Sequence, residues 1–265
     1  MFFVGIDLAW SERNTSAISI IKANGNRGVL INWISKIKTN EEILNWVLER
    51  IKNEPAVISI DAPLIVKNLK GRREADALVT KLFRKYHAGA HPTNIERLEK
   101  FGGLRGESLT KLFEEKGYSN NPYFKPKSEV RAVIEVFPHP AIVVFFNLKK
   151  TLKYKAKKGR KQDFLLAEFR KYQKDIKTLE SKEPALKLPK EIFVDISKLK
   201  RKELKEYEDL LDSIICAYIG FYYWYWGTRK NAVLGSLKKG YIVTPIFDWM
   251  KKVLSQKQSK LKEFI

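Results

Sequence analysis

Acidic residues close three apolar stretches of the sequence. Asp7, Asp61 and Glu135 each lie at or near the C-terminal end of such a stretch. In open α/β sheets, ligands bind outside the carboxyl ends of the parallel strands, and a carboxylate there costs free energy unless its charge is balanced. A single acid of this kind is typically a cap or turn residue. Three at corresponding positions predict a metal site, and oxygen donors suit Mg²⁺ or Mn²⁺.

A second acidic pair, Asp209 and Asp212, is spaced three residues apart in a stretch with helical periodicity. The same arc of that helix carries small residues, namely Ser213, Cys216, Ala217 and Gly220. Because small side chains let a helix approach a sheet closely, we expect the two aspartates to reach the strand ends. The alternative is an exposed first turn, where acids interact favourably with the helix dipole.

Two further side chains are candidates for contact with a substrate. Arg73 precedes Asp76 by three residues. It is interpreted either as a phosphate-facing group or as half of a surface ion pair. His139 follows the stretch that ends at Glu135. It is interpreted either as a general acid–base group or as a cap of the next helix.

The most basic part of the chain is the stretch 149–161, which holds eight basic residues and no acid. Within it, Lys157, Lys158 and Arg160 are expected to contact phosphates. Such contacts set affinity for nucleic acid without setting sequence preference.

The first elements that must position these side chains are three strands, predicted at 2–8, 16–22 and 29–37. The sequence "NGNRG" at 24–28 is typical of a hairpin turn, because Asn and Gly tolerate positive φ. The chain therefore begins with an antiparallel meander.

A helix and a buried parallel strand are predicted next. Thr39 is a typical N-cap, and helical periodicity continues to about residue 53. The apolar stretch 56–63 then ends at a proline, as expected for a buried parallel strand. A helix at 72–86 and a further strand at 130–139 follow.

The remaining segments complete one predicted domain spanning 1–265. Residues 87–128 are irregular around one short helix near 107–116, and we interpret them as an insertion or lid. The rest is predicted as helices at 162–180 and 200–226, a hairpin and a short basic helix. The aromatic run at 221–226 has helical spacing, which favours a place in the core over base stacking.

The composition indicates a basic, well-packed chain with a polyanionic partner. It has 265 residues, 44% of them hydrophobic, and a formal net charge of +21. Such a surplus attracts nucleic acid first and anionic membranes second; the alternative is the Lys-rich surface of a high-temperature protein. The longest apolar stretch, 213–226, is shorter than the ~20 residues of a membrane span. Without a signal peptide or a cysteine pair, we expect a cytoplasmic protein with no membrane contact.

Four short motifs add a family resemblance. They are "GIDLAW" at 5–10, "SIDAPL" at 59–64, "EVFPH" at 135–139 and "DSIICAY" at 212–218. In this order they resemble the DUF429 family, which is regarded as a set of nucleases of the ribonuclease H-like superfamily. The resemblance implies an α/β fold with a ribonuclease H-like core. That core is a five-stranded mixed sheet whose first three strands are antiparallel, flanked by helices.

The resemblance also implies a site. By similarity to Holliday-junction resolvases, the metal ligands and catalytic acids would be Asp7, Asp61, Asp209 and Asp212, with Glu135 belonging to the family's own site. Two Mg²⁺ or Mn²⁺ ions would hydrolyse a phosphodiester bond, one activating water and the other stabilising the leaving oxygen.

Two other functions stay open at this point. One is a non-catalytic nucleic-acid-binding or scaffold protein whose acids are structural. The other, an actin-like kinase or ATPase, is disfavoured because "AWSERNTS" at 9–16 lacks the glycines of a phosphate loop. The sequence distinguishes neither DNA from RNA nor one oligomeric state from another.

Overall fold

A mixed sheet of six strands forms the centre of the fold, in the order β5-β4-β1-β2-β3-β6. The computed structural model describes residues 1–52, 54–157 and 159–262. The strands are β1 (Phe2–Asp7), β2 (Ser16–Asn24), β3 (Arg27–Ile37), β4 (Ala56–Asp61), β5 (Arg131–Glu135) and β6 (Ala185–Lys187). β1, β2 and β3 are antiparallel neighbours, whereas β4 runs parallel to β1, β5 to β4 and β6 to β3.

The five predicted strands are all present, and the antiparallel order of the first three is confirmed. The predicted number of strands is wrong by one, because β6 adds a sixth strand beside β3. β6 has only three residues. A stretch that short shows no alternation of polar and apolar residues, so its place in the sheet is decided by the partner strand.

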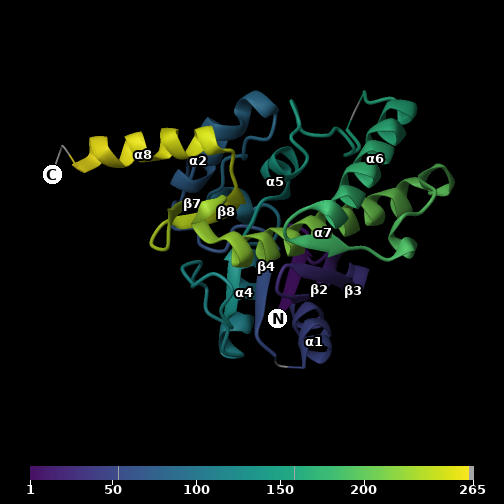
Figure 1. The fold of residues 1–265 in the computed structure, drawn as a ribbon, viewed down its shortest axis with the longest axis horizontal. Coiled ribbons are helices and arrows are strands. Elements are labelled where there is room, and N and C mark those ends of the chain that lie inside the picture. Colours follow the sequence, from purple (N-terminus) through teal and green to yellow (C-terminus); the bar gives the residue numbers. More distant parts are fainter. Residues whose placement is uncertain (53, 158, 263–265) are drawn as a thin grey trace.

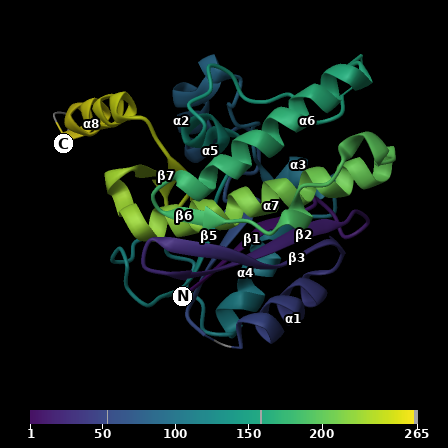
Figure 2. The ribbon, with the colours of Figure 1, turned by 45° about the vertical axis from the view of Figure 1, so that its right-hand side comes forward.

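Helices cover both faces of this sheet (Figures 1 and 2). One face carries α5 (Pro138–Phe145), α6 (Gln162–Lys177) and α7 (Arg201–Trp226), and the other carries α1 (Asn40–Ile51) and α4 (Arg105–Glu115). The remaining elements are α2 (Glu74–Phe83), α3 (Ile95–Glu99), the hairpin β7 (Asn231–Ser236) and β8 (Gly240–Pro245), and α8 (Asp248–Lys262). α8 extends away from the sheet in both views.

The two faces of the sheet bury separate cores. Alternate residues of a strand point to opposite faces, so Phe3 and Val57 pack with α7 while Val4 and Ile58 pack with α1 and α4. α7 is the longest helix described, with 26 residues. The aromatic run at its end lies in the core as predicted, with Phe221 fully buried.

Local signals also held where they were strongest. Thr39 caps α1: its Oγ1 accepts from the backbone N–H of Glu42, and Glu42 Oε2 accepts in return from the N–H of Thr39. Within 87–128, the predicted helix is α4, and α3 is an additional short helix that was not expected. None of the helices in the described part of the chain combines the length and hydropathy of a membrane span.

Candidate functional site

Two carboxylates lie side by side at the carboxyl edge of the sheet. Asp7 and Asp61 are Cα partners in the parallel pair of β1 and β4. Neighbouring strands are about 4.8 Å apart, and partners in register point to the same face. Both side chains are half-buried, so this pair reaches solvent. The position predicted for these two residues is the one the structure gives them.

α7 lies directly on the strands that carry this pair. A Cβ atom on Gly5 would clash with the backbone of Ser213 and Ala217, and one on Gly220 would clash with Ser59 Oγ. The small-residue face of α7 therefore packs against the sheet, as predicted. This close approach brings the first half of the helix to the end of β1.

Asp209 of α7 interacts directly with Asp7, which is its hydrogen-bond partner. Because an ionised carboxylate only accepts, such a bond needs a proton on one of the two groups. Burial, together with the charge of Asp7, raises the pKa of Asp209 to about 8. Burial and Asp7 also raise the pKa of Asp61 well above its usual value. Burial and then mutual repulsion therefore outweigh the nearby lysines at these carboxylates.

Asp212 is placed differently, since its carboxylate is fully buried and fully engaged. Its Oδ1 accepts from the hydroxyls of Tyr154 and Tyr172, at 2.5 and 3.0 Å. Its Oδ2 lies 2.8 Å from Lys155 Nζ. Although burial alone would raise it, Lys155 and these hydrogen bonds hold the pKa of Asp212 below its usual value.

Two lysines stand among the acids, and sequence reasoning missed both as site residues. Lys155 lies against Asp212, and Lys205 pairs with Glu208 and with Asp209. Burial disfavours the charged form of Lys155, but the neighbouring acids raise the pKa of Lys155 well above its usual value. The two lysines face a larger set of acids, namely Asp7, Asp61, Glu208, Asp209 and Asp212. Lys205 could have been found from its spacing of four residues before Asp209.

The structure does not bring Glu135 together with Asp7 and Asp61, contrary to expectation. Glu135 is the register partner of Ile60, one residue before Asp61. Because side chains alternate along a strand, Glu135 points to the opposite face of the sheet. Its carboxylate accepts from Arg73 at 2.6 and 2.9 Å and from the backbone N–H of Leu64 at 2.9 Å.

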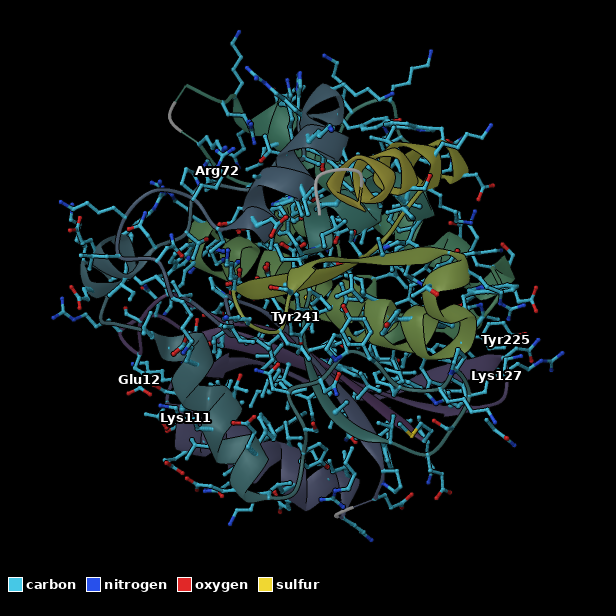
Figure 3. All side chains as sticks on the ribbon, turned by 90° about the vertical axis from the view of Figure 1, so that its left-hand side faces the viewer. Glu12, Arg72, Lys111, Lys127, Tyr225 and Tyr241 are labelled. Carbon is cyan, nitrogen blue, oxygen red and sulfur yellow. The ribbon has the colours of Figure 1, made fainter. Side chains whose placement is uncertain are left out.

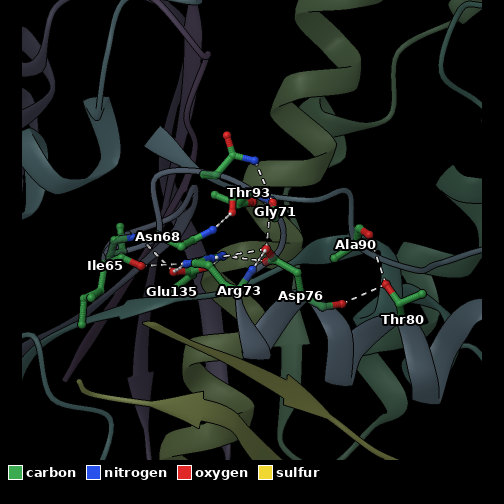
Figure 4. A network of polar contacts seen from close by, with 11 residues as sticks. Ile65, Asn68, Gly71, Arg73, Asp76, Thr80, Ala90, Thr93 and Glu135 are labelled. Atoms are coloured by element: carbon green, nitrogen blue, oxygen red, sulfur yellow. Dashed lines mark hydrogen bonds and ion pairs between the residues drawn. The ribbon is translucent and has the colours of Figure 1, made fainter. Parts of the chain in front are cut away.

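Arg73 is buried, so it does not face a phosphate; the expected ion pair with Asp76 is present, but in the interior and not on the surface. Its side chain is 1% exposed, whereas a phosphate-facing group or a surface ion pair requires exposure. Figure 4 shows the guanidinium between Glu135 and Asp76, with Nη2 2.9 Å from Asp76 Oδ1. Asp76 Oδ2 also accepts from the backbone N–H of Thr93. We call Arg73, Asp76 and Glu135 the arginine cluster.

His139 is the second residue of α5 and does not cap it, because the helix begins after Phe137. Its Nδ1 is buried and has no hydrogen-bond partner within the described residues. Burial, and the charge of nearby Lys155, lower the pKa of His139 to about 3. The imidazole is therefore neutral near pH 7 and is a weak base there.

The basic stretch forms a loop that brings Lys155 to Asp212. Lys157 is exposed, and Lys158 lies outside the described residues. Arg160 donates from Nη1 to the backbone carbonyls of Lys153 and Lys155, so it fixes the loop that carries Lys155. Beside it is an open cavity of about 500 Å³ lined by Lys153, Lys157, Gly159, Arg160, Lys161 and Phe164.

The donor set was tested for a divalent cation. No three His, Cys, Asp or Glu side chains among the described residues are already grouped around a common metal position. Asp7, Asp61 and Asp209 nevertheless supply only oxygen, and their raised pKa values indicate negative charge without a matching cation. In chemistry and charge these three residues suit Mg²⁺ or Mn²⁺. We call Asp7, Asp61, Asp209, Asp212 and Lys155 the aspartate cluster.

Comparison with known proteins adds one finding. No curated protein and no solved structure matches the chain. A sequence model described as "Protein of unknown function (DUF429)" matches residues 5–230. The match begins two residues before Asp7, includes the whole aspartate cluster and ends just beyond α7. The chain belongs to the DUF429 family.

Proposed function

We propose that the protein is a divalent-metal-dependent nuclease that hydrolyses phosphodiester bonds of nucleic acid in the cytoplasm. One observation carries the proposal. Asp7 and Asp61 stand in register at the carboxyl edge of the sheet, with Asp209 against them and too few cations to balance them. Acids that repel one another cost stability, and a site for a cation is the chemical reason to keep them.

The strand order supports a ribonuclease H-like core as part of this proposal. β3, β2, β1, β4 and β5 follow one another in the sheet, with the first three strands of the chain antiparallel. The family resemblance implies a mixed sheet whose first three strands are antiparallel. β6 is an addition at the edge beside β3.

The residues divide the work as follows. Asp7, Asp61 and Asp209 would hold the metal ions, which when bound supply activation of water and stabilisation of the leaving oxygen. Tyr154 and Tyr172 keep Asp212 ionised and in place, and Asp212 in turn positions Lys155. The imidazole of His139 stays neutral near Lys155 and Asp212, and its low pKa makes it a weak proton acceptor near pH 7.

The basic loop would bind the substrate backbone. Lys157 and Arg160 line the cavity beside Lys155 and give it positive charge. With a net charge of +21, the whole surface favours a polyanion. Arg73 and Glu135 are left out of this site because they satisfy each other.

One observation favours a second function, nucleic-acid binding without hydrolysis. The ammonium group of Lys155 already balances Asp212 at 2.8 Å. A chain in which a lysine permanently replaced the metal would bind a strand and leave it intact.

A cleavage assay tests the proposal. Labelled single-stranded, duplex, hybrid and branched nucleic acids are incubated with the protein and Mg²⁺ or Mn²⁺, with EDTA as the blank. Asp7→Asn should lower the cleavage rate by on the order of 100-fold or more. The matched control is Asp248→Asn, since Asp248 is 94% exposed and pairs with Lys251 on the surface; this variant should cleave like the wild type.

The outcomes separate the two functions. Metal-dependent cleavage that Asp7→Asn abolishes supports the nuclease. Tight binding with no cleavage of any substrate, with or without metal, rules the nuclease out and leaves the binding protein.

A further inference from the structure

Two aromatic side chains lie exposed against each other beside the aspartate cluster. Trp10 and Phe101 are each 46% exposed. Their ring centroids are 5.3 Å apart at an interplanar angle of 53°. They come from segments about ninety residues apart: the loop after β1 and the insertion 87–128. A single exposed aromatic ring is ordinary, but a contacting pair from two distant segments requires a structure that holds it.

The pair is close to the proposed chemistry. Trp10 follows Asp7 by three residues, and three residues span at most about 11 Å even when fully extended. This distance corresponds to one or two nucleotides of an extended strand. A base that contacts Trp10 therefore leaves its neighbouring phosphates within reach of Asp7.

The loop that carries Trp10 is held rigidly. Arg105, which is 8% exposed, donates from Nη1 to the carbonyl of Ala9 at 2.7 Å and to that of Ser11 at 3.2 Å. Its Nε donates to Asn40 Oδ1 at 3.0 Å. The backbone N–H of Asn40 donates in turn to Glu12, whose side chain Figure 3 shows at the edge of the molecule. Trp10 thus sits between two residues that are tied to α1 and α4.

The insertion is fastened to the same place. Phe101 and Gly103 donate from their N–H groups to the carbonyl of Leu98, which closes the end of α3. Gly103 has φ +101°, a conformation that favours glycine. Three residues on, a Cβ atom on Gly106 would clash with the carbonyl of Pro63, which lies just after Asp61. The insertion therefore holds Phe101 in a defined position relative to both aspartates.

Among the described residues, the rings of this pair carry no side-chain cation, whereas several other aromatic rings near the surface do. Lys230 lies 3.8 Å from the ring of Trp226, Lys85 lies 4.0 Å from that of Trp249, and Lys127 lies 3.9 Å from that of Tyr225. Across the described part of the chain, no cation lies over Trp10 or Phe101. Figure 3 shows Lys127 and Tyr225 at the opposite end of this view from Glu12.

We propose that Trp10 and Phe101 form a stacking site for an unpaired base, so that the protein takes single-stranded nucleic acid at its aspartate cluster. Uncovered rings stack on any base, whereas the bases of a duplex are hidden in its own stack. The net charge of +21 over the whole chain favours a polyanionic ligand. The inference rests on the proposed function for the role of Asp7, but it is tested by binding alone.

The test is fluorescence anisotropy in EDTA with labelled single-stranded DNA and RNA and with blunt duplexes of the same sequences. Trp10→Ala and Phe101→Ala should each weaken single-strand binding about tenfold or more, and duplex binding by less than about threefold. Trp10→Phe should retain most of the affinity. The matched controls are Tyr123→Ala and Trp249→Ala, because these rings are also exposed, at 59% and 38%. Circular dichroism melting establishes that each variant is folded.

Several results would overturn the stacking site: wild-type protein that does not prefer single strands, equal losses in the control variants, or equal losses on duplexes. A change of oligomeric state on gel filtration of Trp10→Ala would instead assign the pair to a protein contact. Failure of the nuclease proposal is distinguishable, because it appears only in the cleavage assay with metal. A wild type that never cleaves, with the expected loss of single-strand binding in Trp10→Ala, would leave the stacking site standing.

Discussion

The arginine cluster and the aspartate cluster lie at the same edge of one sheet, and both contain acids at the ends of parallel strands. In the arginine cluster, one guanidinium contacts Glu135 and Asp76, and each partner is at least 96% buried. In the aspartate cluster, Asp7 and Asp61 reach solvent and Lys155 is 29% exposed. An acid at the end of an apolar strand thus belongs to a closed ion-pair network in the arginine cluster. In the aspartate cluster the same kind of acid belongs to an open network with fewer cations than acids.

The comparison indicates that the neighbouring cation decides whether an acid at the end of a strand is structural or available to a ligand. Arg73 offers several N–H donors in a fixed plane, which matches two carboxylates and leaves nothing for a ligand. Lys155 and Lys205 are single charges among more numerous acids. Acids that repel one another at a solvent-accessible position are typical of a functional site, whereas a buried, fully paired ion pair is typical of a structural role.

Removing the cation from each cluster should have the largest effect on the free energy of unfolding, and the loss should differ most between the two clusters. Arg73→Ala leaves two buried carboxylates unpaired, so we expect the free energy of unfolding to fall by about 3–5 kcal/mol. Lys155→Ala removes the cation from buried Asp212, but Lys155 is itself 29% exposed and Asp212 keeps its two tyrosine hydrogen bonds, so we expect a smaller loss, of about 1–3 kcal/mol. Urea denaturation in EDTA measures both.

Addition of Mg²⁺ is the control for this pair of variants. It should stabilise Lys155→Ala more than wild type and leave Arg73→Ala unchanged. Equal losses for the two variants would contradict the distinction between a closed and an open cluster.

The hydrogen bonds to Asp212 come next in size. Tyr154→Phe removes the 2.5 Å bond to a buried carboxylate, and we expect a loss of about 1.5–3 kcal/mol in unfolding free energy. Tyr172→Phe, which removes the 3.0 Å bond, should lose less. Tyr123→Phe serves as the exposed control. A loss below about 0.5 kcal/mol for Tyr154→Phe would show that this carboxylate is solvated after all.

The pH dependence of stability should report on the aspartate cluster through Asp209. Asp209 has a folded pKa of about 8 against an ordinary 3.8, so the folded chain binds more protons and stability falls as pH rises between these values. His139, with a pKa lowered from 6.5 to about 3, acts in the opposite direction below pH 6.5. Between pH 6.5 and 8 we therefore expect unfolding free energy in EDTA to fall by about 1 kcal/mol per pH unit.

Asp209→Asn checks this assignment. The variant should flatten the slope between pH 6.5 and 8, because its amide does not titrate. A wild-type stability that is constant or rises with pH in that window would mean that the aspartate cluster is not short of positive charge.

The smallest effect is expected at Lys157, which lies in the same loop as Lys155 but is exposed. Lys157→Gln should leave stability unchanged within about 0.5 kcal/mol. Binding to nucleic acid should weaken a few-fold, with the salt dependence of log K reduced by about one. An unchanged salt dependence would remove Lys157 from the phosphate contacts.

The predictable part of this protein is local or repeats along the chain. Short apolar runs bounded by turn signals located β1 to β5, and the Thr39 cap located the start of α1, because each signal lies within a few neighbouring residues. The small residues of α7 indicated its close contact with the sheet, because only short side chains allow backbones to approach. Sequence alone therefore determined the main strands, the packing helix and the neighbours Asp7 and Asp61.

Tertiary structure decided which acids share a counter-charge. A shift of one residue in register turned Glu135 to the other face of the sheet, where Arg73 neutralises it. Lys155 reached Asp212 through a loop fixed by Arg160, and no periodicity in the basic stretch marks that lysine. Charge balance depends on distances between residues far apart in the chain, whereas the sequence pattern reports only which residues are neighbours along it.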